Sequence, residues 1–394
     1  MNPPIDIATR LLHVPTVAPL QPPTSPPIYP SVGFRFRDYA HAKGVFDGSV
    51  PGLVGARAGN PTAAGFEARM AALEGAQAAL AVPSGMAAVT AGLLAFAHAG
   101  DSIVVDHVVY VGTYGLLREV VPRFGIEVRA VDTTDLAEVE RAIDATTRAI
   151  FVESPGSWQL KIPDIGALVT LARPRGIRLI VDGTMATGYL QQPLALGADL
   201  AVYSATGYLN GHADAVLGVV AGSTDVIDTL RGRFRNEMGA AVAPTEVWVV
   251  NRSLATLALR LTHQCATTLR LAEHLEGAPG VRRVIYPWLA SHPQHGVARR
   301  QMRAGGGILL FELERVDAVA RFVAALEICA FTVGIGGPIT TVFCPAHSFP
   351  GASADELERR GVNDRLVRLS VGLEAADDLV RDVDRALQRA RSGT

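Results

Sequence analysis

Ser204-Ala205-Thr206-Gly207-Tyr208-Leu209-Asn210-Gly211-His212 follows a mostly apolar run at residues 198–203. A polar, glycine-containing turn after a buried strand is where α/β proteins bind their ligands. Ser204 and Thr206 are two residues apart, so at an extended strand end both hydroxyls point to the same side, as a pair that holds a phosphate would require. The segment predicts a ligand site at a strand end, although its phosphate signal is weak when taken alone.

The length and charge of the chain narrow the classes of function. With 394 residues, the chain has room for a large α/β domain and a smaller one. Its net charge of -2 and pI near 6.6 give no electrostatic reason to expect nucleic acid or an anionic membrane as a partner. No leader pattern opens the sequence, no run of about 18 apolar residues occurs, and the cysteines lack metal-ligand or redox spacing. We therefore expect a cytoplasmic protein that acts on small molecules without a metal.

Three parts can be distinguished along the chain. Residues 1–60 contain many prolines and glycines, which predicts an extended N-terminal arm that packs on a partner. Strand and helix signals then alternate, which predicts a mainly parallel sheet with helices on both faces in residues 61–250. Thr62 is expected to cap the first helix of this domain. Residues 251–394 are expected to form a smaller C-terminal domain.

A second phosphate signal lies near the start of the large domain. Residues 78–82 are typical of a short buried strand, and Ser84-Gly85-Met86 opens a helix that runs to about residue 97. The dipole and the free N–H groups at a helix N-terminus favour an anion, and glycine lets the anion approach closely. The alternative is that Ser84 only caps the helix, and the local sequence does not decide between the two.

Two charged residues occupy strand positions. Asp182 ends the apolar strand at residues 177–181, where a carboxylate is costly unless it is paired, so we expect it to meet a cation or a donor in a site. A structural cap on the next turn is the alternative. Apolar positions alternate over residues 367–371, which places Arg368 on the opposite face of a strand. Taken alone, this arginine could also be a solvated residue of a sheet surface.

Together these motifs resemble the Cys/Met-metabolism family of pyridoxal-phosphate (PLP) enzymes, the trans-sulfuration group that includes cystathionine γ-synthase, cystathionine lyases and methionine γ-lyase. The family's S-A-T-K-Y-L-G-G-H corresponds to residues 204–212, and the resemblance extends from about Thr9 to Leu387. It implies a PLP-dependent transferase-like α/β fold of type I with a smaller C-terminal α+β domain. It also implies an arm that embraces a neighbouring subunit, in a homotetramer built as a dimer of dimers with active sites at the dimer interface.

The resemblance also implies roles for single residues. Tyr110, in a match to the family's Y-G-G-T-Y, would stack on the pyridine ring, although without the motif a half-buried packing role would be preferred. Asp182 would pair with the protonated pyridine nitrogen. Arg368 would grip the α-carboxylate of an amino-acid substrate with its bidentate fork. The other cofactor-binding residues that the resemblance implies are Arg57, which would reach the phosphate across the dimer interface, Ser84, Gly85, Met86, Ser204 and Thr206.

The chain departs from the family pattern at the catalytic lysine. In the family this lysine carries the cofactor as a Schiff base and shuttles protons, and Gly207 can do neither. Loss of a positioned proton shuttle alone costs about 10²–10⁴ in rate. Lys43 and Lys161 are the two lysines of the chain, and neither is placed by the sequence to replace it.

Four further departures fall within the implied site. The family tyrosine before the arginine is Gly55, and the family asparagine of V-D-N-T is Gly183. The E-T-P-S-N-P motif reads Glu153-Ser154-Pro155-Gly156-Ser157-Trp158, so the asparagine that would contact the cofactor phenol oxygen is Ser157. The serine of the family's S-L-G-G is Gly334. These changes indicate an altered pocket.

Three interpretations stay open. In the first, which we adopt, the protein is a PLP-dependent lyase or transferase that performs β- or γ-elimination or replacement on an amino acid with a side-chain leaving group, and the expected substrate belongs to specialised metabolism. Its PLP would be held without a lysine, or as pyridoxamine phosphate or a preformed external aldimine, with Tyr110 or a substrate group moving protons. In the second, the chain is a non-catalytic homologue that binds a PLP-like ligand or a partner subunit. In the third, Gly207 is an engineered Lys→Gly trapping substitution or a sequence error.

Overall fold

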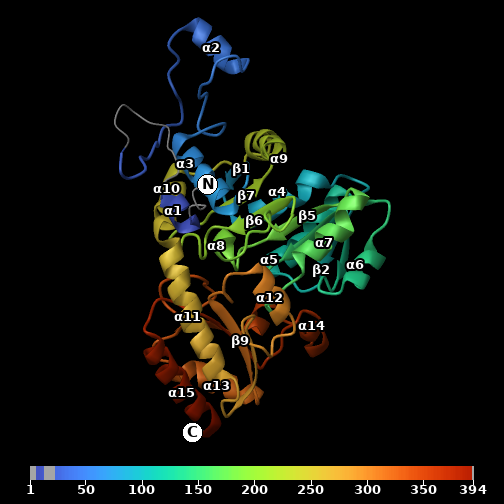
Figure 1. Cartoon of the computed structure of the whole chain (residues 1–394), viewed down its shortest axis with the longest axis vertical. Helices are drawn as coiled ribbons and strands as arrows, with labels where there is room; N and C mark the ends of the chain where they lie inside the picture. Colours follow the sequence, from blue (N-terminus) through green and yellow to red (C-terminus); the bar gives the residue numbers. More distant parts are fainter. Residues whose placement is uncertain (1–5, 13–22, 393–394) are drawn as a thin grey trace, which may run out of the picture.

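The computed structural model describes residues 6–12 and 23–392. A seven-stranded sheet with the order β1-β7-β6-β5-β4-β2-β3 forms the centre of the large domain (Figure 1). The five neighbouring strands β6, β5, β4, β2 and β3 pair in parallel, whereas β7 runs antiparallel to both β6 and β1. The prediction of a mainly parallel sheet is therefore confirmed. The strands are β1 (Ala78–Val82), β2 (Ser102–Asp106), β3 (Glu127–Val131), β4 (Thr147–Glu153), β5 (Arg178–Asp182), β6 (Leu200–Ser204) and β7 (Gly218–Gly222).

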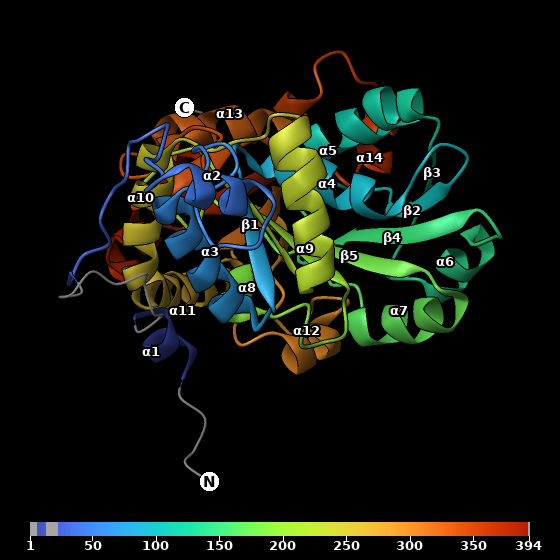
Figure 2. The ribbon, with the colours of Figure 1, turned by 90° about the horizontal axis from the view of Figure 1, so that it is seen from above.

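Helices cover both faces of this sheet, as the alternating pattern predicts (Figure 2). Successive side chains of a strand point to opposite faces. Leu80 and Val82 therefore pack in the cluster with α4 and α9, whereas Ala79 and Ala81 pack in the cluster with α3. The helices of this part are α3 (Pro61–Glu74), α4 (Gly85–Phe96), α5 (Val111–Gly115), α6 (Leu136–Ala142), α7 (Ile165–Ala172), α8 (Thr187–Leu190), α9 (Thr224–Leu230) and α10 (Pro244–Ser253).

The first helix of the large domain is capped by a different residue from the one expected. The Asn60 side chain accepts a hydrogen bond from the Thr62 backbone N–H at 2.9 Å, so Asn60 is the N-cap of α3 and the assignment of this role to Thr62 is wrong. Pro61 occupies the first helical position, where its fixed φ suits a helix and its missing N–H is not needed. The Thr62 hydroxyl instead accepts the backbone N–H of Tyr29 at 2.9 Å and ties the arm to the domain.

A second, five-stranded sheet with the order β10-β11-β12-β9-β8 forms the smaller domain. Its neighbours pair antiparallel except β10 and β11, and helices α13 and α15 share its buried cluster, which gives the expected α+β arrangement. Its strands are β8 (Val281–Ile285), β9 (Ile308–Leu313), β10 (Ala330–Phe331), β11 (Thr341–Phe343) and β12 (Leu366–Ser370). Its helices are α12 (His295–Gln301), α13 (Val316–Ala325), α14 (Ala354–Arg359) and α15 (Ala376–Ser392).

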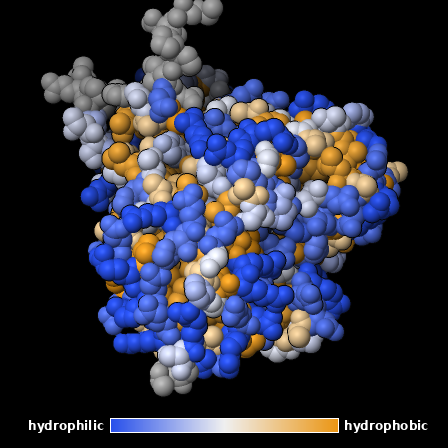
Figure 3. Space-filling model, turned by 60° about the horizontal axis from the view of Figure 1, so that its bottom comes forward, coloured by the Kyte–Doolittle hydropathy of each residue, from blue (hydrophilic) through white to orange (hydrophobic). Residues whose placement is uncertain are grey.

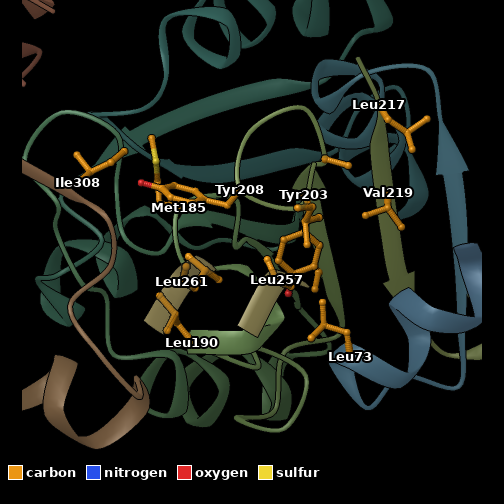
Figure 4. Packing of buried hydrophobic residues seen from close by; sticks show 14 of the residues in the cluster. Leu73, Met185, Leu190, Tyr203, Tyr208, Leu217, Val219, Leu257, Leu261 and Ile308 are labelled. Carbon is orange, nitrogen blue, oxygen red and sulfur yellow. The ribbon is translucent and has the colours of Figure 1, made fainter. Parts of the chain in front are cut away.

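Helix α11 (Leu257–Leu275) joins the two domains (Figure 1). Its N-terminal half, with Leu257 and Leu261, belongs to the apolar cluster of the large domain, in which Tyr203 and Tyr208 are also buried (Figure 4). Its C-terminal half, with Leu271 and Leu275, belongs to the cluster of the smaller domain. Because α11 contributes side chains to the cores of both domains, the domain boundary between residues 250 and 251 stays a proposal.

The two helices of the N-terminal segment differ in how they contact the large domain (Figure 1). Helix α1 (Ile7–Leu12) is anchored, with Ile7 and Leu11 buried in the cluster of the large domain. Helix α2 (Tyr39–Phe46) projects beyond the large domain and exposes Tyr39 and Phe46 (Figure 1). The described part of residues 1–60 thus contains one anchored helix and one projecting helix, residues 1–5 and 13–22 lie outside the described residues, and the arm as a whole stays a prediction.

The remaining short elements are π and 3-10 turns. The surface carries both hydrophilic and apolar residues (Figure 3). The face in Figure 3 intersperses hydrophilic residues with apolar ones. In the part of the chain that the structure describes, every helix is too short or too polar to cross a lipid bilayer. The turns are η1 (Leu116–Val120), η2 (Val121–Phe124), η3 (Arg173–Arg175), η4 (Arg231–Glu237), η5 (Leu254–Thr256) and η6 (Pro345–Ser348).

Candidate functional site

A cavity of about 870 Å³ lies where the ends of β4, β5 and β6 meet the start of α4 and residues of the smaller domain. Loops at the carboxyl ends of parallel strands are the usual ligand position in such sheets. All predicted site residues except Arg57 line this cavity, although they are distant in sequence. They are Ser84, Gly85, Met86, Tyr110, Asp182, Ser204, Thr206, Gly207 and Arg368.

The two predicted phosphate segments meet at the start of α4. A β-carbon on Gly85 would lie 2.5 Å from Cβ and 2.9 Å from Cα of Ser204, so only glycine lets the helix approach the end of β6 this closely. Ser84 is the N-cap of α4, and its hydroxyl accepts the backbone N–H of Ala87 at 3.1 Å. The capping alternative for Ser84 is therefore observed. It leaves other N–H groups of the first turn available for an anion.

Thr206 does not lie at an extended strand end. Strand β6 ends at Ser204, and the next residues form a turn in which the Gly211 N–H bonds the Gly207 carbonyl at 2.7 Å. The argument from strand alternation is therefore wrong for Thr206, although both hydroxyl residues line the cavity. The Thr206 hydroxyl accepts the backbone N–H of Leu217 at 3.2 Å and holds this turn against the start of β7.

Asp182 lies at the end of β5, beside Glu153 at the end of β4. The Asp182 carboxylate accepts a hydrogen bond from the backbone N–H of Thr184 at 2.9 Å, so Asp182 does cap the following turn, which was the alternative role. No described basic side chain forms an ion pair with Asp182. Burial raises the pKa of both carboxyl groups, and the nearby charge of Asp182 raises the pKa of Glu153 further. A protonated ring nitrogen would relieve this unpaired charge.

Glu153 is a site residue that sequence reasoning missed. It accepts the Tyr110 N–H at 2.7 Å, the Ser157 N–H at 3.1 Å and the Ser157 hydroxyl at 2.6 Å. The Ser157 hydroxyl is thus committed to Glu153, which removes it as a substitute for the family asparagine. The signal that could have identified Glu153 is the one used for Asp182, an acidic residue that ends a buried parallel strand.

Tyr110 and Arg368 bring an aromatic ring and a cation to the cavity. The Tyr110 side chain is 44% exposed, and its ring lies over Gly112, where a β-carbon would be 2.7 Å from Cε1. Arg368 on β12 is only 5% exposed, so the alternative of a solvated surface arginine is wrong. Its Nη2 donates to the Val333 carbonyl at 2.7 Å, and burial lowers its pKa to about 10.

No lysine of the described chain lines the cavity. Lys161 ion-pairs with Asp132 at 2.9 Å and lies 3.9 Å from Asp106, and Lys43 is exposed on α2. At Gly207, a β-carbon would lie 3.1 Å from Cγ1 and 3.4 Å from the carbonyl oxygen of Ile335. The Ile335 side chain therefore crowds the place where a lysine side chain would begin.

Arg57 is exposed on the arm and lies outside the cavity. Its guanidinium donates to the Asn236 carbonyl within the same chain. Gly55, two residues earlier, pairs with Gly33 in an isolated bridge. The single chain therefore does not bring Arg57 to the other site residues, and Arg368 is the basic side chain of the lining.

The residues present fit PLP. Three buried polar atoms of lining side chains have no partner within the described residues, namely Thr113 Oγ1, Trp158 Nε1 and Arg368 Nε. Such atoms are unfavourable unless a ligand or water satisfies them. The start of α4 suits a phosphate, the Asp182 carboxylate suits a protonated ring nitrogen, and the exposed face of Tyr110 suits a planar ring.

Comparisons with known proteins show what the whole chain is similar to. Residues 8–388 match the family described as Cys/Met metabolism PLP-dependent enzyme. The chain is 39% identical over 366 residues to L-methionine gamma-lyase of Pseudomonas putida, with 92% of each chain covered. It is 39% identical over 362 residues to O-succinylhomoserine sulfhydrylase of Pseudomonas aeruginosa, covering 91% of this chain and 90% of the relative. A solved structure from Campylobacter jejuni with N'-Pyridoxyl-Lysine-5'-Monophosphate superposes with a TM-score of 0.93 at 28% identity, covering 98% of this chain and 100% of that one.

Proposed function

Because the chain belongs to the Cys/Met-metabolism family of PLP-dependent enzymes, we propose that it performs β- or γ-elimination or replacement on an amino acid that carries a side-chain leaving group, without a cofactor-bound lysine. The observation that carries this proposal is the convergence of a helix N-terminus, Asp182, Tyr110 and Arg368 on one cavity. Relatives named as a lyase and as a sulfhydrylase support elimination and replacement as the two candidate reactions.

The residues of the cavity divide the work of binding. The first turn of α4, with Ser84, Gly85 and Met86, and the hydroxyls of Ser204 and Thr206 would hold the PLP phosphate. Asp182 would keep the ring nitrogen protonated, and Tyr110 would cover the ring. When bound, PLP supplies an electron sink for negative charge that develops on the substrate carbons.

Substrate orientation and proton movement fall to Arg368 and Tyr110. The fixed guanidinium of Arg368 would hold the α-carboxylate and so determine which bonds of the substrate face the cofactor. Tyr110 would move the proton, because its hydroxyl belongs to an exposed side chain of the lining and its backbone is held by Glu153. Glu153 is less suited to this task, because three donors already occupy its two oxygens.

The assembly proposed is a homotetramer of two dimers with active sites at the dimer interface. A phosphate dianion in the cavity would be poorly neutralised by one chain, because Arg368 is the basic side chain of its lining. Arg57, exposed on the projecting arm, is free to approach the cavity of a second copy once its bond to the Asn236 carbonyl exchanges. A cytoplasmic location and a substrate of specialised metabolism remain parts of the proposal.

One observation favours a second candidate, a homologue that binds a ligand without turning it over. Ile335 crowds the Gly207 position, and Ser157 is bound to Glu153, so two family contacts are absent. The test supplies PLP, a thiol and a panel of amino acids with sulfur or oxygen leaving groups, and measures release of the leaving group, because elimination and replacement both expel it. The catalytic proposal expects release with at least one substrate, and expects Asp182→Ala and Arg368→Ala to abolish it. No release across the panel, with binding retained, would establish the second candidate.

A further inference from the structure

Arg368 carries a buried charge that the described chain does not neutralise. The residue is 5% exposed, and no described carboxylate lies within ion-pair distance of it. Its Nη2 is used by the Val333 carbonyl at 2.7 Å, whereas its Nε is buried without a partner. A buried guanidinium of this kind is unfavourable unless an anion completes its environment.

Trp158 presents a second unpaired donor beside this guanidinium. The indole is 2% exposed, lines the same cavity, and has no described partner for its Nε1. Cζ of Arg368 lies 5.9 Å from the centroid of the Trp158 ring. Phe349 packs edge-on against the same ring at 6.2 Å, which limits its rotation. Buried indole N–H groups usually have a hydrogen-bond partner.

We propose that Trp158 is a substrate-positioning residue whose indole N–H donates to the carboxylate that Arg368 binds. Two unpaired buried donors that share one cavity need acceptors, which water supplies when no ligand is bound, and a carboxylate offers two oxygens that accept from both. The inference rests on the proposed function in one respect, namely that this carboxylate is the α-carboxylate of an amino acid. It narrows the substrates to amino acids whose α-carboxyl group is free.

The neighbouring Ser157 does not supply a competing donor to this part of the cavity. Ser157 occupies the motif position of a family asparagine, but its hydroxyl donates to Glu153 at 2.6 Å. It therefore cannot also donate to a ligand. Trp158 follows it directly and supplies an N–H to the same cavity. A purely packing role for Trp158 would be satisfied equally well by phenylalanine, so the N–H itself can be tested.

The first experiment measures hexanoate binding by calorimetry to the protein without added PLP. Trp158→Phe keeps an aromatic ring and removes the donor, and we expect it to weaken hexanoate binding about tenfold, equivalent to about 1.4 kcal/mol. Trp288→Phe is the matched control, because Trp288 stacks with Arg299 at 4.6 Å and does not line this cavity. Neither substitution should alter the binding of 1-hexanol, which lacks the charge. Equal hexanoate affinity in the parent and Trp158→Phe, or no hexanoate binding by the parent, would overturn the proposal.

A second measurement leaves Trp158 in place and so does not depend on how the Phe variant folds. The chain has three tryptophans, so in the variant Trp248→Phe/Trp288→Phe the tryptophan emission, excited selectively over that of the tyrosines, comes from Trp158 alone. Hexanoate should shift the emission of Trp158 to the red, because an acceptor polarises the indole N–H, and 1-hexanol should not. Identical emission with and without saturating hexanoate would also overturn the proposal.

A third comparison distinguishes failure of the proposed function from failure of the role proposed for Trp158. L-Norleucine, which has no leaving group, and 1-aminopentane, its analogue without the carboxylate, are compared on protein equilibrated with PLP. If PLP does not bind, the proposed function fails while the hexanoate results still decide the role of Trp158. If PLP and L-norleucine bind and Trp158→Phe weakens neither L-norleucine nor hexanoate, the function stands and the role of Trp158 is lost. Weaker binding of L-norleucine but not of 1-aminopentane in Trp158→Phe supports the proposal.

Discussion

A β-carbon on Gly183 would lie 2.5 Å from Cε1 of Tyr203, so the tyrosine ring occupies the space that a side chain at residue 183 would need. Tyr203 is fully buried, and its hydroxyl donates to Glu74. Tyr203 on β6 therefore fills the space beside Gly183 that the family asparagine would need. This contact leaves no room for a larger side chain at residue 183 while Tyr203 keeps its position.

Restoring an asparagine at residue 183 should destabilise the protein. Overpacking of a buried position costs about 1–3 kcal/mol, so we expect Gly183→Asn to lower the free energy of unfolding by that amount. The measurement is urea denaturation followed by circular dichroism. Gly232→Asn is the control, because a β-carbon there meets nothing within 4 Å.

The same pair should be coupled energetically. In a Tyr203→Ala background the space beside Gly183 is open, so adding asparagine there should cost less than in the parent. Residues in contact show interaction energies of about 0.5–3 kcal/mol. Additive effects of the two substitutions would contradict the steric account.

Gly207→Lys should restore covalent attachment of PLP only in part. The β-carbon at residue 207 meets Ile335 Cγ1 at 3.1 Å, so the isoleucine must shift before a lysine side chain can enter. We expect borohydride reduction with PLP to add one pyridoxyl group to Gly207→Lys, and to add it more completely in Gly207→Lys/Ile335→Val. Intact-protein mass spectrometry provides the readout. Gly232→Lys serves as the control, and labelling of that variant to the same extent would show that the reaction is not specific to the site.

The stability of the protein should fall as the pH rises from about 5 to 8. Burial raises the pKa of Glu74 to about 8, although its hydrogen bond from Tyr203 opposes the shift. The folded state then binds more protons than the unfolded state between the unfolded pKa, near 4.3, and about 8. The stabilisation is complete below that lower value and is lost as the pH rises through the folded pKa. Glu74→Gln should flatten the slope of unfolding free energy against pH in this window, and an unchanged slope would refute the role of Glu74.

Asp182→Asn should weaken PLP binding at least tenfold, which corresponds to about 1.4 kcal/mol. The amide keeps the shape of the residue and loses the charge that would hold a protonated ring nitrogen. Fluorescence titration of PLP gives the dissociation constant. Asp199→Asn is a suitable control, because Asp199 precedes β6 at the opposite end of the strand and pairs with Arg178 at 2.8 Å. Equal affinity of Asp182→Asn and the parent would mean that the carboxylate does not contact the ring.

Part of the site could be predicted from sequence because its signals are local. The pair Ser84-Gly85 after a short apolar strand indicates a helix N-terminus, and Asp182 is an acidic residue at the end of an apolar strand. Glu153 has the same local signal, but its importance depends on its pairing with β5, which places it beside Asp182. The commitment of Ser157 to Glu153 likewise depends on three-dimensional contacts.

The fold could be predicted from the sequence for a similar reason. The predictions that were wrong depended on exact element boundaries or on contacts between distant residues. Alternating strands and helices predicted the parallel sheet, because buried strands have a recognisable apolar pattern. The choice of Asn60 over Thr62 as the cap depended on where Pro61 starts the helix. The place of Thr206 in a turn depended on β6 ending at Ser204. The packing of Tyr203 on Gly183 joins two strands that are separated in sequence, so neither residue reveals it alone.

The central claim is that the cavity binds PLP and an amino acid although Gly207 stands at the lysine position. The most direct measurement is the visible absorption spectrum of the purified protein dialysed with PLP, recorded before and after adding a panel of amino acids. We predict a retained chromophore that shifts with at least one amino acid, and that shifts less in Arg368→Ala. A protein that retains no chromophore under any of these conditions would contradict the claim.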